Sequence, residues 1–323
     1  MSVRVGFIGC GSIGSVHTQA AQMCSDLGEV VGGSDINNEQ RNSFTAKTSA
    51  PAFSDALEML NTTKPDAVVI STPPNVRYAM IKECINRRIA ILCEKPLALN
   101  FAEAKKIVAL AKPFKKVCAT GFCHRFNAAV CTMKDMLQNG DLGEPIEFIN
   151  FFVGPASWLA DTWRTDISIS GGGNFYDNGV HSVDLFSYLF GKIKSSSGMA
   201  RYMWPGRGED SGFMMIVSES GVVGQITTSW VYPYNASTIE IVGTKGAVRF
   251  SYDAIDELKI CNDSGSWKTI KINEDRRFVN QMRAFLQAVN GQPQEQLATF
   301  EDGMEAIGIV EQVCKNKINV NKN

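Results

Sequence analysis

Hydrophobic positions in residues 1–122 follow two spacings that alternate along the chain. Short runs of apolar and β-branched residues predict buried strands at 3–8, 30–34, 67–71, 89–93 and 116–120. Between them, as at 76–88 and 101–112, apolar residues recur at helical spacing. Strand and helix in repetition favour parallel strands with right-handed crossovers. We therefore expect an α/β domain with a doubly wound parallel sheet over 1–122.

The pattern changes after residue 122. Turn sequences such as Gly243-Thr244-Lys245-Gly246 separate short runs that predict hairpin-spaced strands. The expected strands are 145–153, 198–204, 212–218, 222–231, 237–242, 247–252, 257–261 and 267–272. The expected helices are 126–139, 177–190, 277–290 and 300–315. We expect 123–323 to form an α+β domain with a large, mostly antiparallel open sheet.

Composition and charge narrow the classes of function. The chain has 323 residues, enough for two separate cores. Its 32 basic and 33 acidic residues give a net charge of −1, so nucleic acid is not an expected partner. No apolar stretch approaches the roughly 20 residues that span a bilayer. Since the first strand follows Met1 too closely for a signal peptide, we expect a cytoplasmic protein that binds no membrane.

Nine cysteines raise the question of disulfides or a metal site. Their number is odd, no Cys-x-x-Cys pair occurs, and several of them fall within apolar or helical patterns. Buried, reduced thiols explain this spacing better than a structural zinc site does. We expect no metal.

The segment Gly9-Cys10-Gly11-Ser12-Ile13-Gly14 matches the pattern G-x-G-x-x-G directly after the first predicted strand. The first glycine permits a tight turn, the second lets the backbone approach a pyrophosphate, and the third lets helix and strand pack closely. The helix that follows presents the positive end of its dipole. We predict that Gly9, Gly11, Ser12, Ile13 and Gly14 bind a dinucleotide, which makes 1–122 a Rossmann domain.

Asp35 ends the second predicted strand. An acidic residue there accepts hydrogen bonds from the adenosine ribose and repels a 2′-phosphate. Because no arginine follows before Arg41, we expect NAD rather than NADP. Alternatively, Asp35 only caps the helix that follows.

The segment Ser71-Thr72-Pro73-Pro74-Asn75 ends the strand predicted at 67–71. Two prolines fix an extended exit from the sheet, and Asn75 is expected to cap the next helix. Such a loop would lie over the middle of a dinucleotide, so Thr72, Pro73 and Asn75 are predicted contacts. A purely structural turn explains these residues equally well.

Lys95 lies in Glu94-Lys95-Pro96, directly after the apolar run at 89–93. Open α/β sheets bind ligands at the carboxyl edge of their strands. A partly desolvated lysine at this edge can exchange protons with a substrate, and we expect Glu94 and Lys95 to border the dinucleotide. The alternative is a solvated lysine at a strand end.

A second constellation begins with Gly171-Gly172-Gly173 and ends at His181. Asp177 and His181 are four residues apart, so on a helix they share one face. His181 is the natural group for proton transfer near neutral pH, and Asp177 could orient its ring. The glycines allow close approach of backbone to a ligand or to the other domain. The alternative is a core histidine that hydrogen-bonds to its neighbour.

Arg125, Trp163 and Arg164 are candidates for a substrate wall. Arginine and an aromatic ring suit a polyhydroxyl substrate through hydrogen bonds and stacking. Either arginine could instead pin a loop through a salt bridge.

Together, these motifs resemble the glucose–fructose oxidoreductase/inositol dehydrogenase (Gfo/Idh/MocA) family over nearly the whole chain. The resemblance rests on Gly9–Gly14, Thr72-Pro73-Pro74, Glu94-Lys95-Pro96, Trp163-Arg164 and Asp177-x-x-x-His181. One departure is Arg77, where many relatives carry histidine, and we expect it to affect packing at the helix start more than chemistry.

The resemblance implies a Rossmann domain and an α+β domain whose open sheet makes contacts in a homodimer or homotetramer. It also implies NAD(P)-dependent oxidation of a secondary alcohol on a sugar, cyclitol or sugar derivative. By position, Lys95, Asp177 and His181 form the catalytic set and contact the substrate. Either Lys95 or His181 could transfer the proton, and we expect the two to converge on the nicotinamide.

Two other functions suit the same scaffold. One is a non-catalytic regulatory protein that senses a dinucleotide, which would not need Lys95 and His181 together. The other is an NADPH-dependent reductase of a keto sugar, which requires that Asp35 does not repel the additional phosphate.

Overall fold

A computed structural model of the chain describes residues 2–319 and divides into two compact units. The first unit runs to Cys123 and also contains Arg277–Met304. The second contains His124–Arg276 and the chain from Glu305 onward. The segment Arg277–Met304 therefore packs with the first unit, whereas the sequence pattern places it in the domain 123–323.

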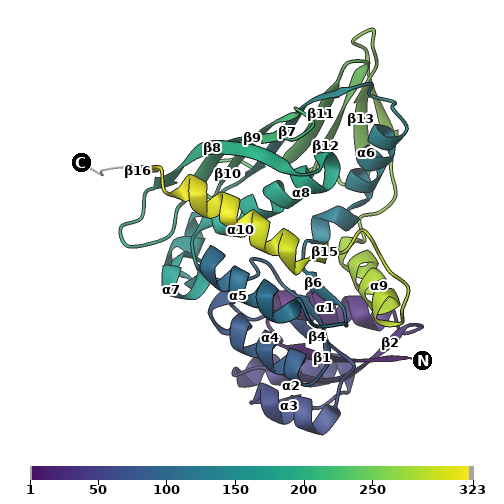
Figure 1. Cartoon of the computed structure of the whole chain (residues 1–323), viewed down its shortest axis with the longest axis vertical. Coiled ribbons are helices and arrows are strands. Elements are labelled where there is room, and N and C mark those ends of the chain that lie inside the picture. Colours follow the sequence, from purple (N-terminus) through teal and green to yellow (C-terminus); the bar gives the residue numbers. More distant parts are fainter. Residues whose placement is uncertain (1, 320–323) are drawn as a thin grey trace. The chain divides into compact units, whose positions relative to one another are not determined.

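The first unit is built on a seven-stranded sheet, sheet A, in the order β15-β6-β5-β4-β1-β2-β3. Its strands β15, β6, β4, β1 and β2 are labelled in Figure 1. Six strands are parallel: β1 (Val3–Ile8), β2 (Gly28–Ser34), β3 (Ala52–Phe53), β4 (Ala67–Ile70), β5 (Ala90–Cys93) and β6 (Cys118–Thr120). The short strand β15 (Ala298–Thr299) pairs antiparallel with β6. Every residue of β4 and β5 is buried, as expected when helices cover both faces of a parallel sheet. The predicted doubly wound sheet is confirmed.

Most helices of the first unit alternate with its strands, and α9 is added from later in the chain. They are α1 (Ser12–Met23), α2 (Asn38–Thr48), α3 (Ala56–Thr63), α4 (Arg77–Asn86), α5 (Phe101–Ala111) and α9 (Arg277–Val289). The amphipathic helix α9 packs against α1, burying Phe285 and Leu286. Arg283 of α9 also forms an ion pair of 2.7 Å with Asp26. These contacts explain why a segment late in the sequence belongs with the first unit.

The second unit is built on a nine-stranded sheet, sheet B, in the order β14-β13-β12-β11-β7-β10-β9-β8-β16. The strands are β7 (Pro145–Val153), β8 (Ile193–Tyr202), β9 (Ser211–Ser218), β10 (Val223–Ser229), β11 (Thr238–Gly243), β12 (Gly246–Ser251), β13 (Glu257–Cys261), β14 (Trp267–Lys271) and β16 (Lys317–Asn319). Only the pairs β7·β10 and β8·β16 are parallel within this described sheet. The predicted large and mostly antiparallel sheet is therefore confirmed.

Helices of the second unit are α6 (Ala128–Gln138), α7 (Ile167–Ser170) and α8 (Val180–Phe190), and α10 (Phe300–Cys314) enters it from the first unit. Helix α8 is anchored to sheet B by an aromatic cluster of Phe148, Phe186 and Phe190, whose ring centroids lie 5.3–5.8 Å apart. Within residues 2–319, no helix has the length and apolar character needed to cross a membrane.

Candidate functional site

The glycine-rich loop joins β1 to α1 at the carboxyl edge of sheet A. Gly9 has a φ of +93°, which other residues rarely adopt. A Cβ on Gly14 would lie 2.2 Å from the carbonyl oxygen of Gly9, so only glycine permits this packing of loop and helix. A Cβ on Gly11 would meet no atom of the described residues within 4 Å, so the backbone there borders open space.

Helix α1 begins directly after the glycine-rich loop. Gly11 is its N-cap, and no side chain in residues 2–319 caps it. The amides of Ser12 and Ile13 therefore point, with the helix dipole, toward whatever occupies the loop. This arrangement suits a pyrophosphate.

Asp35 holds the end of β2 against the glycine loop. Its Oδ2 accepts the amide of Cys10 at 2.8 Å, and its Oδ1 accepts the amide of Asn37 at 2.8 Å. The cap of α2 is the side chain of Asn37, which accepts the amides of Glu39 and Gln40. The alternative that Asp35 only caps this helix is therefore wrong.

Arg41 folds back toward the same strand end. Its Nη1 donates to the carbonyl oxygens of Asp35 at 2.9 Å and Ile36 at 3.0 Å. A guanidinium suits a 2′-phosphate, whereas the carboxylate of Asp35 repels one. The carboxylate of Asp35 and the guanidinium of Arg41 both border the position that the sequence assigns to the ribose. Because the two charges favour different cofactors, the preference for NAD remains a prediction.

The loop after β4 is tied to the glycine loop. The hydroxyl of Ser71 donates to the carbonyl oxygen of Gly9 at 2.8 Å. Asn75 is exposed within a 3₁₀ turn, Pro74–Val76, and Val76 is the N-cap of α4. No side chain of the described chain caps α4, so the predicted cap at Asn75 is wrong. The 3₁₀ turn moves the start of α4 further along the chain, so the side chain of Asn75 does not reach its first amides.

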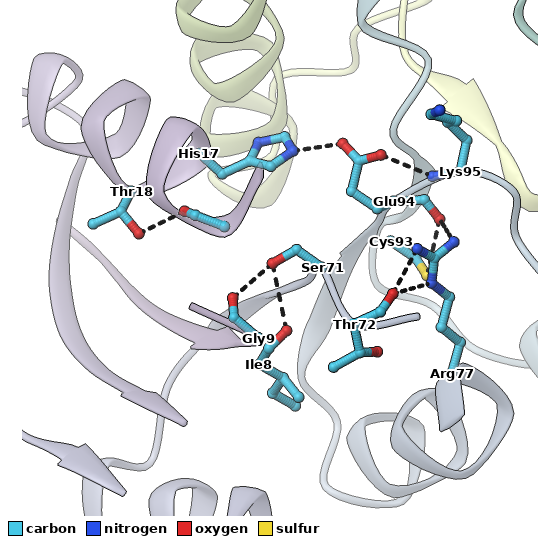
Figure 2. Close-up of polar contacts among 11 residues, drawn as sticks. Ile8, Gly9, His17, Thr18, Ser71, Thr72, Arg77, Cys93, Glu94 and Lys95 are labelled. Carbon is cyan, nitrogen blue, oxygen red and sulfur yellow. Dashed lines mark hydrogen bonds and ion pairs between the residues drawn. The ribbon is translucent and has the colours of Figure 1, made fainter. Parts of the chain in front are cut away.

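Lys95 follows β5, and its backbone is fixed by the buried carboxylate of Glu94 (Figure 2). Oε1 of Glu94 accepts a hydrogen bond from His17 Nε2 at 2.7 Å, and Oε2 accepts the amide of Lys95 at 3.1 Å. Burial raises the pKa of Glu94, but the hydrogen bond from His17 and the charges of Lys95 and Arg77 outweigh it and hold that pKa below its usual value. The carboxylate is therefore ionised at neutral pH.

The side chain of Lys95 is partly exposed, and in Figure 2 it points away from Arg77. This is the placement that a lysine needs to meet a ligand at the edge of the sheet. Contact between Lys95 and a substrate remains a prediction.

The glycine triplet allows two backbones to touch within the second unit. A Cβ on Gly173 would lie 2.1 Å from the carbonyl oxygen of Glu209, and one on Gly208 would lie 2.5 Å from the amide nitrogen of Gly173. The sequence predicts an approach to a ligand or to the other domain, whereas this contact is made with the loop that contains Glu209, within the same unit.

Glu209 anchors the start of the helix that carries Asp177 and His181. Its carboxyl group is buried, and Oε1 accepts the amides of Phe175 and Tyr176 at 3.0 Å each. Burial raises the pKa of Glu209 above its usual value, although the backbone hydrogen bonds lower it in part. A carboxyl oxygen at helical amides also complements the helix dipole.

Asp177 lies in a π-helical turn, Phe175–Gly179, and His181 lies in the first turn of α8. The sequence predicts one helix over 177–190, but the helical chain begins earlier and with a wider turn. A Cβ on Gly179 would lie 2.1 Å from the ring of Phe175, so glycine makes room for this ring. Single π turns are frequent at functional sites.

His124 is a neighbour of His181 in the segment 121–127, which the sequence indicates as substrate wall without giving His124 a role. The two rings meet edge to face with centroids 4.5 Å apart, and Nδ1 of His124 hydrogen-bonds with the hydroxyl of Tyr252. Tyr252 lies 128 residues further along the chain, so no local pattern connects the two. The available signal was the rarity of histidine, since the chain has only three.

Arg125 is held by a buried ion pair. Its Nη2 lies 2.6 Å from Oδ1 of Asp184, and its guanidinium also lies over the ring of Tyr188. Arg125 therefore forms the salt bridge that the alternative predicts. Contact between Arg125 and a substrate remains a prediction. Trp163 is 39% exposed, and the guanidinium of Arg164 lies 4.9 Å from its ring centroid.

Several cysteine thiols of the first unit are buried. No cluster of three or more potential metal ligands occurs in residues 2–319. Burial raises the pKa of Cys10, Cys84 and Cys93 to about 12, so these thiols stay protonated near neutral pH.

The residues of the first unit fit a nicotinamide dinucleotide. The backbone at Gly11 is open, the first amides of α1 lack a side-chain cap, and Asp35 presents a fixed carboxylate. The hydroxyl oxygen of Thr72 is buried without a hydrogen-bond partner among the described residues. These features meet the needs of a pyrophosphate and a ribose at one edge of the sheet.

Two family models match the chain. One, described as an oxidoreductase family with an NAD-binding Rossmann fold, matches residues 3–122. The other, described as a GFO/IDH/MocA C-terminal domain, matches residues 130–249. Together they span most of both predicted domains.

Relatives and solved structures agree with these matches. The chain is 26% identical to myo-inositol 2-dehydrogenase of Thermotoga maritima, over 94% of this chain and 93% of that protein. It is 30% identical to scyllo-inositol 2-dehydrogenase (NAD⁺) of Bacillus subtilis, over 60% of this chain and 57% of that protein. The structure of levoglucosan dehydrogenase with NADH and levoglucosan matches with a TM-score of 0.88 and 21% identity, covering 97% of this chain and 96% of that one. That structural similarity establishes a shared fold.

Proposed function

Because the chain belongs to the Gfo/Idh/MocA oxidoreductase family, we propose that it transfers hydride between a nicotinamide dinucleotide and a secondary alcohol of a sugar or cyclitol. The observation that carries the proposal is the segment Glu94-Lys95-Pro96, fixed at the same edge of sheet A as an open glycine-rich loop. Relatives named as inositol dehydrogenases support the class of substrate.

The first unit supplies the residues that hold the dinucleotide. Gly9, Gly11 and the amides at the start of α1 would hold the pyrophosphate, and Asp35 would hold the ribose. A bound nicotinamide would supply the hydride-accepting ring for oxidation of the carbon that carries the hydroxyl group. Glu94 keeps the backbone of Lys95 in place at the same edge of sheet A.

The chain's own side chains handle the proton of that hydroxyl group. His181 accepts the proton as a general base, and Asp177 orients its imidazole. Lys95 donates a hydrogen bond to the substrate oxygen and stabilises the negative charge that develops there. His124 contacts His181 and supports the position of its ring.

A panel of sugars and inositols, each assayed with NAD⁺ and NADP⁺ by nicotinamide absorbance, tests the activity. Lys95→Ala and His181→Ala should each lower kcat at least about 100-fold, the usual contribution of a proton-transfer group. Their unfolding temperatures should stay near that of the wild-type protein. Lys106→Ala, which removes an exposed lysine from α5, is the matched control and should keep full activity. Near-normal turnover by either site variant would refute the assignment.

We also propose that NAD is preferred over NADP because of Asp35. Asp35→Ser removes the repulsive carboxylate and leaves the guanidinium of Arg41 beside it. The ratio of kcat/KM for NAD⁺ to that for NADP⁺ should fall at least about tenfold. Asp35→Asn keeps one acceptor oxygen while losing the charge, so it should also reduce the preference. An unchanged ratio in both variants would show that Asp35 does not select the cofactor.

We further propose that the protein forms a homodimer or homotetramer through sheet B. Met199 of β8 and Met215 of β9 are 45% and 52% exposed. Met199 pairs with Phe213, which lies on the same face of β9 as Met215, so the two methionines share one face of the sheet. Exposed apolar residues gathered on one sheet face support an interface there.

A further inference from the structure

Arg77, the first residue of α4, is only 3% exposed, and its guanidinium reaches the ends of two neighbouring strands. Its Nε and Nη2 donate to the carbonyl oxygen of Thr72 at 2.9 and 2.6 Å. Its Nη1 donates to the carbonyl oxygens of Glu94 and Pro96. Figure 2 shows the guanidinium between Thr72 and Glu94.

These acceptors belong to the two loops that matter for the proposed chemistry. Thr72 lies in the loop after β4, and Glu94 and Pro96 flank Lys95 on both sides. One rigid cation therefore holds the backbone before and after Lys95 and ties it to the neighbouring loop. A planar guanidinium has five donors in a fixed geometry, which a lysine ammonium cannot reproduce.

The other side of the segment is held independently. His17, on α1, binds the carboxylate of Glu94, while Arg77, on α4, binds backbone carbonyls. Helices α1 and α4 therefore each hold the segment Glu94-Lys95-Pro96 through one side chain. The ionised Glu94 also lies near the buried guanidinium of Arg77 and balances its charge.

We propose that Arg77 is a positioning residue for Lys95, which extends its expected role beyond packing at the helix start. The effect on turnover rests on the proposed function, since it requires Lys95 to touch the substrate. Holding the Cα of Lys95 on both sides fixes the origin of a long and flexible side chain. A displacement of about 1 Å in such a group can lower a rate about 100-fold.

Two variants of Arg77 separate positioning from stability. Arg77→Met removes all the donors, and kcat should fall about 100-fold while KM for the alcohol and Kd for NADH change less than about threefold. Arg77→Lys keeps the charge and most of the volume but cannot reach three carbonyl oxygens, so kcat should fall about tenfold. Arg87→Met is the matched control, since Arg87 is a partly exposed residue at the end of α4 that binds Glu83 and Asn61.

Amide hydrogen exchange tests the same point without any enzymatic reaction. In Arg77→Met, and to a smaller degree in Arg77→Lys, the amides of Lys95 and Leu97 should exchange at least about tenfold faster, whereas those of β1 should not change. Turnover at the wild-type level in Arg77→Lys, or exchange that is unchanged or accelerated equally throughout the first unit, would overturn the proposal. If the wild-type protein oxidises no alcohol, the proposed function fails, and the exchange experiment still decides whether Arg77 holds this segment.

Discussion

Glu94 is ionised although it is buried, and the groups around its carboxylate explain why. Burial raises the pKa of Glu94, but the hydrogen bond and charge of His17 and the charges of Lys95 and Arg77 together outweigh it, so the pKa lies below the usual value. A carboxyl group whose pKa is lowered by folding stabilises the protein above its unfolded pKa, and that stabilisation is lost as the pH falls through the folded pKa.

His17→Leu should therefore destabilise the first unit strongly near pH 7. The variant leaves a buried carboxylate without its side-chain donor, which costs about 3 kcal/mol. His17→Gln supplies an amide donor and should lose less. The difference between His17→Leu and wild type should shrink as the pH falls toward the acid range, because a protonated carboxyl needs the donor less. Urea denaturation at several pH values measures this.

Gln22→Leu is the control for that experiment, since Gln22 is exposed on the same helix. Its free energy of unfolding should stay within about 0.5 kcal/mol of wild type. Equal denaturation midpoints for His17→Leu and wild type would show that the hydrogen bond between His17 and Glu94 does not stabilise the fold.

The π turn and α8 form one element whose start depends on a single carboxyl group. Glu209 accepts the amides of Phe175 and Tyr176, and burial raises its pKa. A group whose pKa is raised by folding contributes stability that is complete below the unfolded pKa and is lost as the pH rises through the folded pKa. Ionised Glu209 is therefore the less favourable form in the folded protein.

Glu209→Gln should gain stability relative to wild type as the pH rises. The amide oxygen keeps an acceptor for Phe175 and Tyr176, while the charge that burial disfavours is absent. The free energy of unfolding of the variant minus that of wild type should be larger at pH 8 than at pH 5, as measured by urea denaturation. Glu219→Gln changes an exposed carboxyl and should show no such trend. A difference that is constant with pH would contradict the role assigned to burial.

Elements with a clear period were predictable from the sequence, and those set by tertiary contacts were not. The runs at 3–8 and 145–153 predicted the strands β1 and β7 with the correct ends. Strands of two or three residues, such as β3 and β15, are too short to show a period. The π turn depends on the ring of Phe175 above Gly179, and the contact between His124 and Tyr252 joins distant segments. Such features depend on packing partners that a local pattern does not name.

On the scale of the whole molecule, the position of a segment in the sequence does not predict which of the two units it belongs to. The amphipathic pattern of α9 predicts a helix with one buried face, and the helix is present. The pattern does not say which surface covers that face. Contacts with α1 place Arg277–Met304 in the first unit, so each unit is built from two separate parts of the chain.

Assembly through sheet B gives the last prediction, because it concerns complete protomers. Met215 lies on the exposed face of β9, while its neighbours Met214 and Ile216 are buried on the opposite face. A charge at Met215 should therefore leave the core intact and weaken an interface formed by the exposed face, since a buried charge without a partner is strongly unfavourable. Light scattering after gel filtration should show a dimer or tetramer for wild type and a smaller mass for Met215→Glu. Met23→Glu adds the same charge at an exposed position of α1 and should keep the wild-type mass. A wild-type monomer at micromolar concentration, or an unchanged assembly in Met215→Glu, would show that this face is not the interface.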